Sequence, residues 1–154
     1  MGMPQTLPDL EVAKTRARKS IAKFTAVSTG GSIIPIPGAD LVTDLYSSMK
    51  MLNEINEIYG LSSQQIDKLD PAFKVMVAEA IVAAGGQAIG RLITKELIVT
   101  LLAKMGKRVT AKQLTKYVPI IGQLASAAIS VTVMASLGEK HRRDCQKVCQ
   151  IVMN

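Results

Sequence analysis

Apolar positions recur every three or four residues over most of the chain, which predicts a protein built from helices. The clearest repeat begins at Leu41 and ends at Tyr59, and it predicts a helix over residues 39–59 that stops at Gly60. A weaker repeat predicts an earlier helix over residues 10–29. Because no run alternates with the period of a strand, we expect an all-α class and a compact helical domain of about five to six helices.

Start and stop signals divide the rest of the chain. Ser62 is the expected N-cap of a short helix, and Asp70 followed by proline marks the expected start of the next one. We expect a flexible N-terminus over residues 1–9 and a single helical domain over residues 10–152. The remaining expected helices are residues 71–105 with a bend at Gly85 and Gly86, a short helix opened by a Thr110 capping box, and residues 123–152.

Two proline-containing corners interrupt the helical pattern. The first is SIIPIPGAD, with Pro35, Pro37 and Gly38, and the second contains Pro119 and Gly122; both read P-I-x-G. Proline removes a backbone donor and disfavours a helical residue before it, so each corner is expected to be a turn between helices. Two helix-break-helix units that face each other would explain why the P-I-x-G motif occurs twice. A repeat of four residues can also arise by chance. The isoleucines of the first corner are expected either to pack in the core or to insert into a bilayer.

The composition suits an anionic partner. The 154 residues are 48% hydrophobic, only 3% aromatic, and carry a net charge of +7. A positive mean hydropathy of +0.24 favours a membrane surface. Nucleic-acid binding is not expected, because few aromatic side chains are present and no known reader motif occurs.

Two basic segments are the predicted contacts with anionic lipid. The first lies in the early helix and the second surrounds the expected end of the long helix. Their residues are Lys14, Arg16, Arg18, Lys19 and Lys23, and Lys104, Lys107, Arg108, Lys112 and Lys116.

Three segments carry a family resemblance. They are IPIPGADLVTDLYSSMKMLNEINEIYGL, VAAGGQAIGRLI and YVPIIGQLASAAISVTVMASLG, within residues 20–140. In this order they resemble the uncharacterised helical domain found C-terminal to bacterial small GTPases and in YcjF-like inner-membrane proteins, with a looser similarity to helical parts of immunity-related GTPases. The resemblance implies an all-α domain, association with membranes or with a GTPase, and no catalysis of its own. A phosphate-binding loop of the G-x-x-x-x-G-K-[ST] type does not occur in this sequence.

Residues 118–138 form an uncharged run of 21 residues. That length matches a bilayer core of roughly 30 Å, but the same run also suits a buried helix of a bundle.

Gly86 and Gly90 form a GxxxG motif, which in a helix permits close packing against a neighbour, inside a protein or inside a membrane. We expect close intramolecular packing at these two glycines.

Few residues suggest chemistry. His141, Cys145 and Cys149 share one helix face, but residues eight apart lie about 12 Å apart along a helix axis, so one metal ion cannot bind all three. Lipidation is an alternative for both cysteines, and Gly2 lies in an M-G-x-x-x-[ST] myristoylation pattern. With two cysteines and one histidine, we expect no cofactor, no catalytic or metal site, and a reducing compartment.

The leading hypothesis is a non-enzymatic docking, scaffolding or self-association module, cytoplasmic and peripheral on the cytosolic face of a membrane. Two further possibilities stay open: the protein forms a homo-oligomer, or it is an integral membrane protein. Two other functions stay open. One is a pore-forming or membrane-disrupting effector, soluble until its apolar helices insert; the other is a soluble partner domain of a separate GTPase.

Overall fold

A computed structural model describes the backbone of residues 2–30, 39–108 and 125–154, and the side chains of residues 2–25, 46–105 and 133–154. Within these residues the chain forms helices and connections and no strand, so the predicted all-α class is confirmed. The helices are α1 (Leu7–Gly30), α2 (Ala39–Ile58), α3 (Ser63–Asp67), α4 (Pro71–Ala84), α5 (Lys95–Arg108) and α7 (Ala125–Met153).

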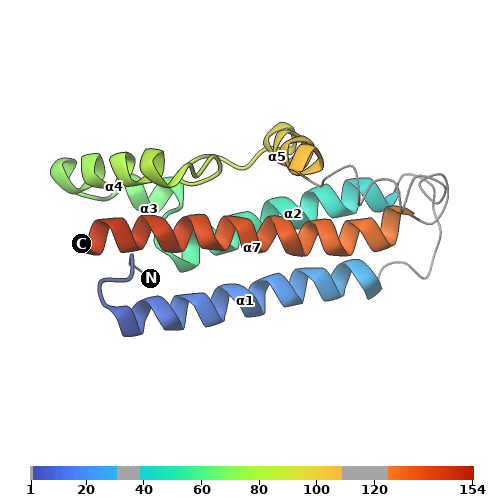
Figure 1. Ribbon diagram of the computed structural model, residues 1–154, viewed down its shortest axis with the longest axis horizontal. Helices are drawn as coiled ribbons and strands as arrows, with labels where there is room; N and C mark the ends of the chain where they lie inside the picture. Colours follow the sequence, from blue (N-terminus) through green and yellow to red (C-terminus); the bar gives the residue numbers. More distant parts are fainter. Residues whose placement is uncertain (1, 31–38, 109–124) are drawn as a thin grey trace.

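Helix α7 is the axis on which the other helices pack. It spans 29 residues, and α1 and α2 both lie along it and along each other. Helix α4 and the connection to α5 lie on the opposite side of α7 from α1 (Figure 1). The molecule therefore has an α1 side and an α4 side, separated by α7.

The core lies where α1, α2 and α7 meet. Helix α1 contributes small side chains, among them the buried Ala13 and Ala17, which let its backbone approach the neighbouring helices closely. Gly138 of α7 sits where a side chain would collide with Ile21 at 2.9 Å and with Met51 at 3.0 Å. This tight junction excludes any larger residue at position 138 without repacking.

Two predicted helix starts are confirmed in detail. The Ser62 hydroxyl accepts a hydrogen bond from the Gln65 amide at 3.3 Å, and the Gln65 side chain accepts one from the Ser62 amide at 3.1 Å, which completes a capping box. The Asp70 carboxylate accepts a hydrogen bond from the Phe73 amide at 3.0 Å, with Pro71 in the first turn.

The predicted long helix over residues 71–105 is wrong. Helix α4 ends at Ala84 because Gly85 adopts a left-handed conformation with φ of 72° and caps the last carbonyls. Residues 85–94 form a non-helical connection, so Gly86 and Gly90 do not share a helix face and make no helical GxxxG contact.

The first helix also begins earlier than predicted, at Leu7, so part of the predicted flexible N-terminus is helical. The preceding residues pack against the body of the molecule, since Pro4 is buried and the Met3 backbone lies against Gly60.

Several predictions fall outside the described residues. Both proline corners, with Pro35, Pro37, Gly38, Pro119 and Gly122, belong to this group, as do Lys112 and Lys116 and the Thr110 capping box. The two facing units therefore stay a prediction. The uncharged run over residues 118–138 is described only from Ala125 onwards, and no helix in the described part of the chain carries an apolar stretch long enough to cross a membrane.

Gly60 and Gly85 offer a matched test of how the N-terminal segment packs. Both residues have a left-handed backbone, with φ of 70° at Gly60 and 72° at Gly85. A Cβ at Gly60 would lie 2.4 Å from the Met3 backbone nitrogen, whereas a Cβ at Gly85 would meet no atom within 4 Å. Gly85→Ala is expected to lower the free energy of unfolding by about 1 kcal/mol, the cost of the backbone conformation alone. Gly60→Ala is expected to lower it by more than about 2 kcal/mol. Urea denaturation measures both, and equal losses would contradict the packing of Met3 against Gly60.

Candidate functional site

A buried polar junction joins three separate parts of the chain. The Asn56 side chain, on α2, donates a hydrogen bond to the Ala88 carbonyl at 3.1 Å. Its carbonyl oxygen lies 2.8 Å from Nε2 of His141 on α7. Because this oxygen can only accept, the imidazole carries its proton on Nε2. Asn56 therefore ties α2 both to α7 and to the connection over residues 85–94.

Cys145 extends this junction without forming a catalytic site. Its sulfur lies 3.7 Å from His141 Nε2 and 3.6 Å from the Asn56 side-chain oxygen, a set of residue types also used in thiol catalysis. However, Cys145 is fully buried, and this burial raises its pKa well above the usual value. A nucleophilic cysteine needs an accessible thiol and a lowered pKa. The arrangement therefore supports packing and not nucleophilic chemistry.

Cys149 is buried as well, with its sulfur 3.9 Å from the Tyr59 carbonyl, and burial raises its pKa to about 12. Neither thiol is exposed for the lipidation considered from the sequence, whereas Gly2 is exposed. The described residues contain no group of three His, Cys, Asp or Glu side chains placed to hold a metal ion.

Burial of His141 disfavours its charged form. Burial, and to a smaller extent the Lys140 charge, lower the pKa of His141 from 6.5 to about 4, against an opposing effect of the Leu52 backbone. The unfolded chain therefore binds more protons than the folded chain between about pH 6.5 and pH 4. Stability is fully present above this range and is lost as the pH falls through it.

The titration of His141 predicts a pH dependence of folding. Between pH 7.5 and pH 5 the free energy of unfolding should fall by about 2 kcal/mol on account of this residue. His141→Gln keeps a donor for Asn56 and removes the titration, so its stability should fall less over the same range. Urea denaturation at the two pH values measures the difference. Equal losses in both proteins would show that the buried imidazole is not responsible.

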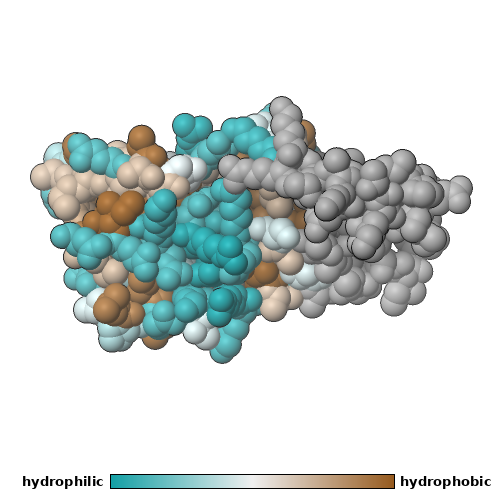
Figure 2. Space-filling view, viewed as in Figure 1, coloured by the Kyte–Doolittle hydropathy of each residue, from teal (hydrophilic) through white to brown (hydrophobic). Residues whose placement is uncertain are grey.

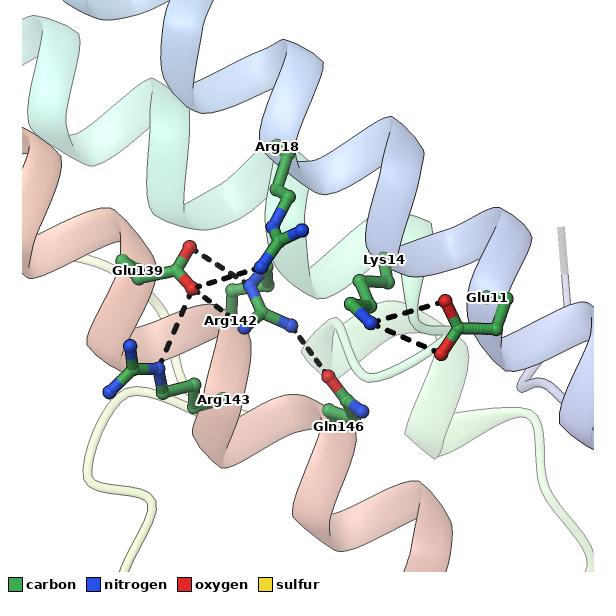
Figure 3. A network of polar contacts seen from close by, with 7 residues as sticks. All are labelled: Glu11, Lys14, Arg18, Glu139, Arg142, Arg143 and Gln146. Atoms are coloured by element: carbon green, nitrogen blue, oxygen red, sulfur yellow. Dashed lines mark hydrogen bonds and ion pairs between the residues drawn. The ribbon is translucent and has the colours of Figure 1, made fainter.

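A charged network joins α1 to α7 on the outside of the core (Figure 3). Glu139 accepts hydrogen bonds from the buried Arg142 guanidinium at 2.7 and 3.0 Å, and its carboxylate also lies 3.5 Å from Arg143 and 3.9 Å from Arg18 of α1. The bond from Arg142 is the main reason why the pKa of Glu139 is lowered. Arg18, predicted as a lipid contact, is thus directed towards an acid of its own chain.

Tyr59 reaches the inner end of this network. Its hydroxyl is buried close to the Arg142 guanidinium. Burial raises the pKa of Tyr59 to about 12, against the smaller lowering effect of the nearby Arg142. Buried, uncharged and remote from solvent, this phenol contributes to packing.

The predicted basic segment of α1 does not form one cationic face. Lys14 pairs with Glu11 at 3.1 Å on the flank that also carries Arg18. Lys23 lies on the other flank and pairs with Glu54 of α2 at 3.0 Å. Arg16, Lys19 and Lys23 line an open groove of about 580 Å³ whose other residues include Glu54 and Glu57. Cations and carboxylates therefore alternate along this side of the molecule.

The second predicted basic segment is described only in part. Lys104 is exposed and donates a hydrogen bond to the Gln87 side chain at 2.9 Å. Lys107 and Arg108 end α5, but their side chains lie outside the described set, like Lys112 and Lys116.

Helix α4 has the most apolar exposed face among the described helices. It buries Val77 and Ala80 and leaves Val75, Met76 and Val82 exposed by 57%, 49% and 82%. Val75 and Val82 are seven residues apart and share one face, and Met76 lies about 100° around the helix from Val75, at the edge of the same exposed side. Over α4 the surface shows brown and pale patches with some teal between them, whereas hydrophilic teal atoms predominate over the middle of α7 (Figure 2).

The connection after α4 displays two further exposed side chains from a fixed backbone. Its inner residues Ala88, Ile89 and Ile93 are buried, and the Gly90 amide donates a hydrogen bond to the Leu61 carbonyl at 3.1 Å. Arg91 and Leu92 lie between these anchors and are exposed, Leu92 by 77%. The apolar pattern does not predict this display, because the predicted helix continues through the segment; the paired glycines before it were the available signal.

Comparison with known proteins identifies the family of this chain but no activity, ligand or partner. Residues 9–150 match the family model described as a domain of unknown function, DUF697. No curated protein and no solved structure matches the chain.

Proposed function

Because the chain belongs to the DUF697 family, whose description names no activity, we propose from the structure that it is a non-enzymatic docking module, which attaches to the surface of an anionic membrane through the exposed face of α4. The observation that carries this proposal is the exposure of Val75, Met76 and Val82 on one side of α4 while its other side is anchored on α7.

Apolar side chains held at a protein surface gain free energy when they leave water. A lipid surface offers such a place to a helix that lies flat in the headgroup region with its apolar face inward. Glu79 is a charged residue on the exposed face of α4, between Met76 and Val82, and Lys74 of the same helix pairs with Asp67 at 2.7 Å. Because the Glu79 carboxylate must stay hydrated, a shallow position of α4 among the headgroups is favoured over deep insertion.

The charge of the chain supports the same partner. A net charge of +7 attracts the protein to anionic lipid, and this attraction weakens as salt screens it. Around α1, by contrast, Lys14 pairs with Glu11 and Lys23 pairs with Glu54 of α2, and Glu57 of α2 lines the same groove as Arg16 and Lys19. We therefore propose the α4 side, rather than the predicted α1 segment, as the side that faces the membrane.

Vesicle sedimentation tests this proposal. The protein should sediment with vesicles containing phosphatidylglycerol, and less with phosphatidylcholine vesicles or at high salt. The double variant Val75→Ser, Val82→Ser should bind about tenfold more weakly, since losing even half of the transfer free energy of two valines is worth about 1.5 kcal/mol. Val12→Ser on α1, with the same exposure as Val75, is the matched control and should bind like the wild-type protein.

Three outcomes contradict the proposal. A protein that stays in the supernatant with every vesicle would favour a soluble partner domain of a separate GTPase. Leakage of a dye trapped in the vesicles would favour the pore-forming hypothesis. Equal binding of the α4 double variant and the α1 control would show that attachment does not use α4.

A further inference from the structure

Beyond the general attachment through α4, and resting on it, we propose that Arg91 and Leu92 form a built contact for one anionic phospholipid headgroup. In this contact the Leu92 side chain enters the apolar region beneath the headgroups, and the Arg91 guanidinium binds the lipid phosphate.

The backbone that carries these two residues is fixed on both sides. Ahead of them, the Ala88 carbonyl accepts a hydrogen bond from buried Asn56, and the Gly90 amide binds the Leu61 carbonyl at 3.1 Å. After them, Ile93 is buried in the core. Gly90 also lies so close to Ile66 that a Cβ there would be 2.8 Å from the Ile66 methyl. Arg91 and Leu92 are therefore displayed by a segment whose neighbours are anchored.

A fixed, exposed leucine costs free energy in water unless something covers it. Leu92 exposes 77% of its surface although the residues on either side of the pair are packed against the core. Folding alone does not require this arrangement, because the buried Ile89 and Ile93 already anchor the segment. A fixed backbone also lowers the entropy that the side chain loses on binding.

The charges around Leu92 select the partner. Arg91 immediately precedes it and Lys95 follows at the start of α5, and neither makes an ion pair or a side-chain hydrogen bond with a described residue. An apolar side chain between two unpaired cations complements an anionic lipid surface, where phosphates lie above hydrocarbon. A guanidinium also binds a phosphate through two parallel hydrogen bonds, which an ammonium group cannot do.

The position in the fold agrees with the attachment through α4. The connection follows α4 directly, and both lie on the side of α7 opposite α1 (Figure 1). A Cβ at Gly90 would lie 3.6 Å from the Ile81 side chain of α4, so the displayed pair follows a residue that lies next to that helix.

The experiment compares single variants on phosphatidylglycerol vesicles by sedimentation. Leu92→Ser and Arg91→Gln should each bind about fivefold more weakly than the wild-type protein, and Arg91→Lys should fall between Arg91→Gln and the wild type. Leu7→Ser and Lys19→Gln remove an exposed leucine and an exposed cation from α1 and should bind normally. Unchanged thermal unfolding confirms that each variant is folded.

A direct readout of insertion uses Leu92→Cys labelled with an environment-sensitive dye. The native thiols of Cys145 and Cys149 are buried, so the label is directed to the introduced residue. Its emission should shift to the blue on phosphatidylglycerol vesicles, while the same dye on Leu7→Cys should not shift.

The outcomes separate this inference from the proposed function. If the α4 double variant loses binding but the Arg91 and Leu92 variants match their α1 controls, the headgroup contact is wrong and attachment through α4 stands. If the wild-type protein binds no vesicle, both are wrong. A dye at position 92 that stays in water on vesicles that bind the protein also overturns the headgroup contact.

Discussion

The side-chain amide of Asn56 sets the relative positions of parts of the chain that are far apart in sequence. It is fully buried, donates to the Ala88 carbonyl and accepts from His141, which lies 85 residues away. A buried amide that lost either partner would leave a polar group unpaired, at a cost of about 1–3 kcal/mol. The fold therefore holds α2, α7 and the connection after α4 in one arrangement.

That arrangement determines what each side of the molecule can do. On the α1 side, the tight packing of small residues brings Arg18 close to Glu139 and Lys23 close to Glu54, so the surface charges largely satisfy one another. On the α4 side, the fixed connection keeps α4 against α7 by only one face and displays Arg91 and Leu92. Val75, Val82 and Leu92 and the unpaired Arg91 and Lys95 thus all lie on the α4 side.

Local signals in the sequence predicted much of the fold. Three features depend on residues within one or two turns of each other and are predicted correctly. They are the all-α class, the helix that ends before Gly60, and the caps at Ser62 and Asp70. The break at Gly85 was missed because apolar residues continue through it. After the left-handed cap the chain buries Ala88 and Ile89 in the core, and this tertiary packing is not visible in the apolar pattern alone.

The candidate site was less predictable for the same reason. Charge counts along α1 identified its cations, but not the acids on α2 and α7 that approach them. Likewise, Cys145 and His141 were correctly placed on one helix face, but only the fold shows that this face is buried against Asn56. Exposure decides which apolar residues are available for contact, and exposure is a property of the packed molecule.

Amide hydrogen exchange, with and without phosphatidylglycerol vesicles, tests most directly whether the α4 side is the docking surface. Attachment through the α4 side predicts that vesicles slow exchange in α4 and in residues 85–94 and leave exchange in α1 unchanged. Slower exchange in α1, with α4 and residues 85–94 unaffected, would contradict it.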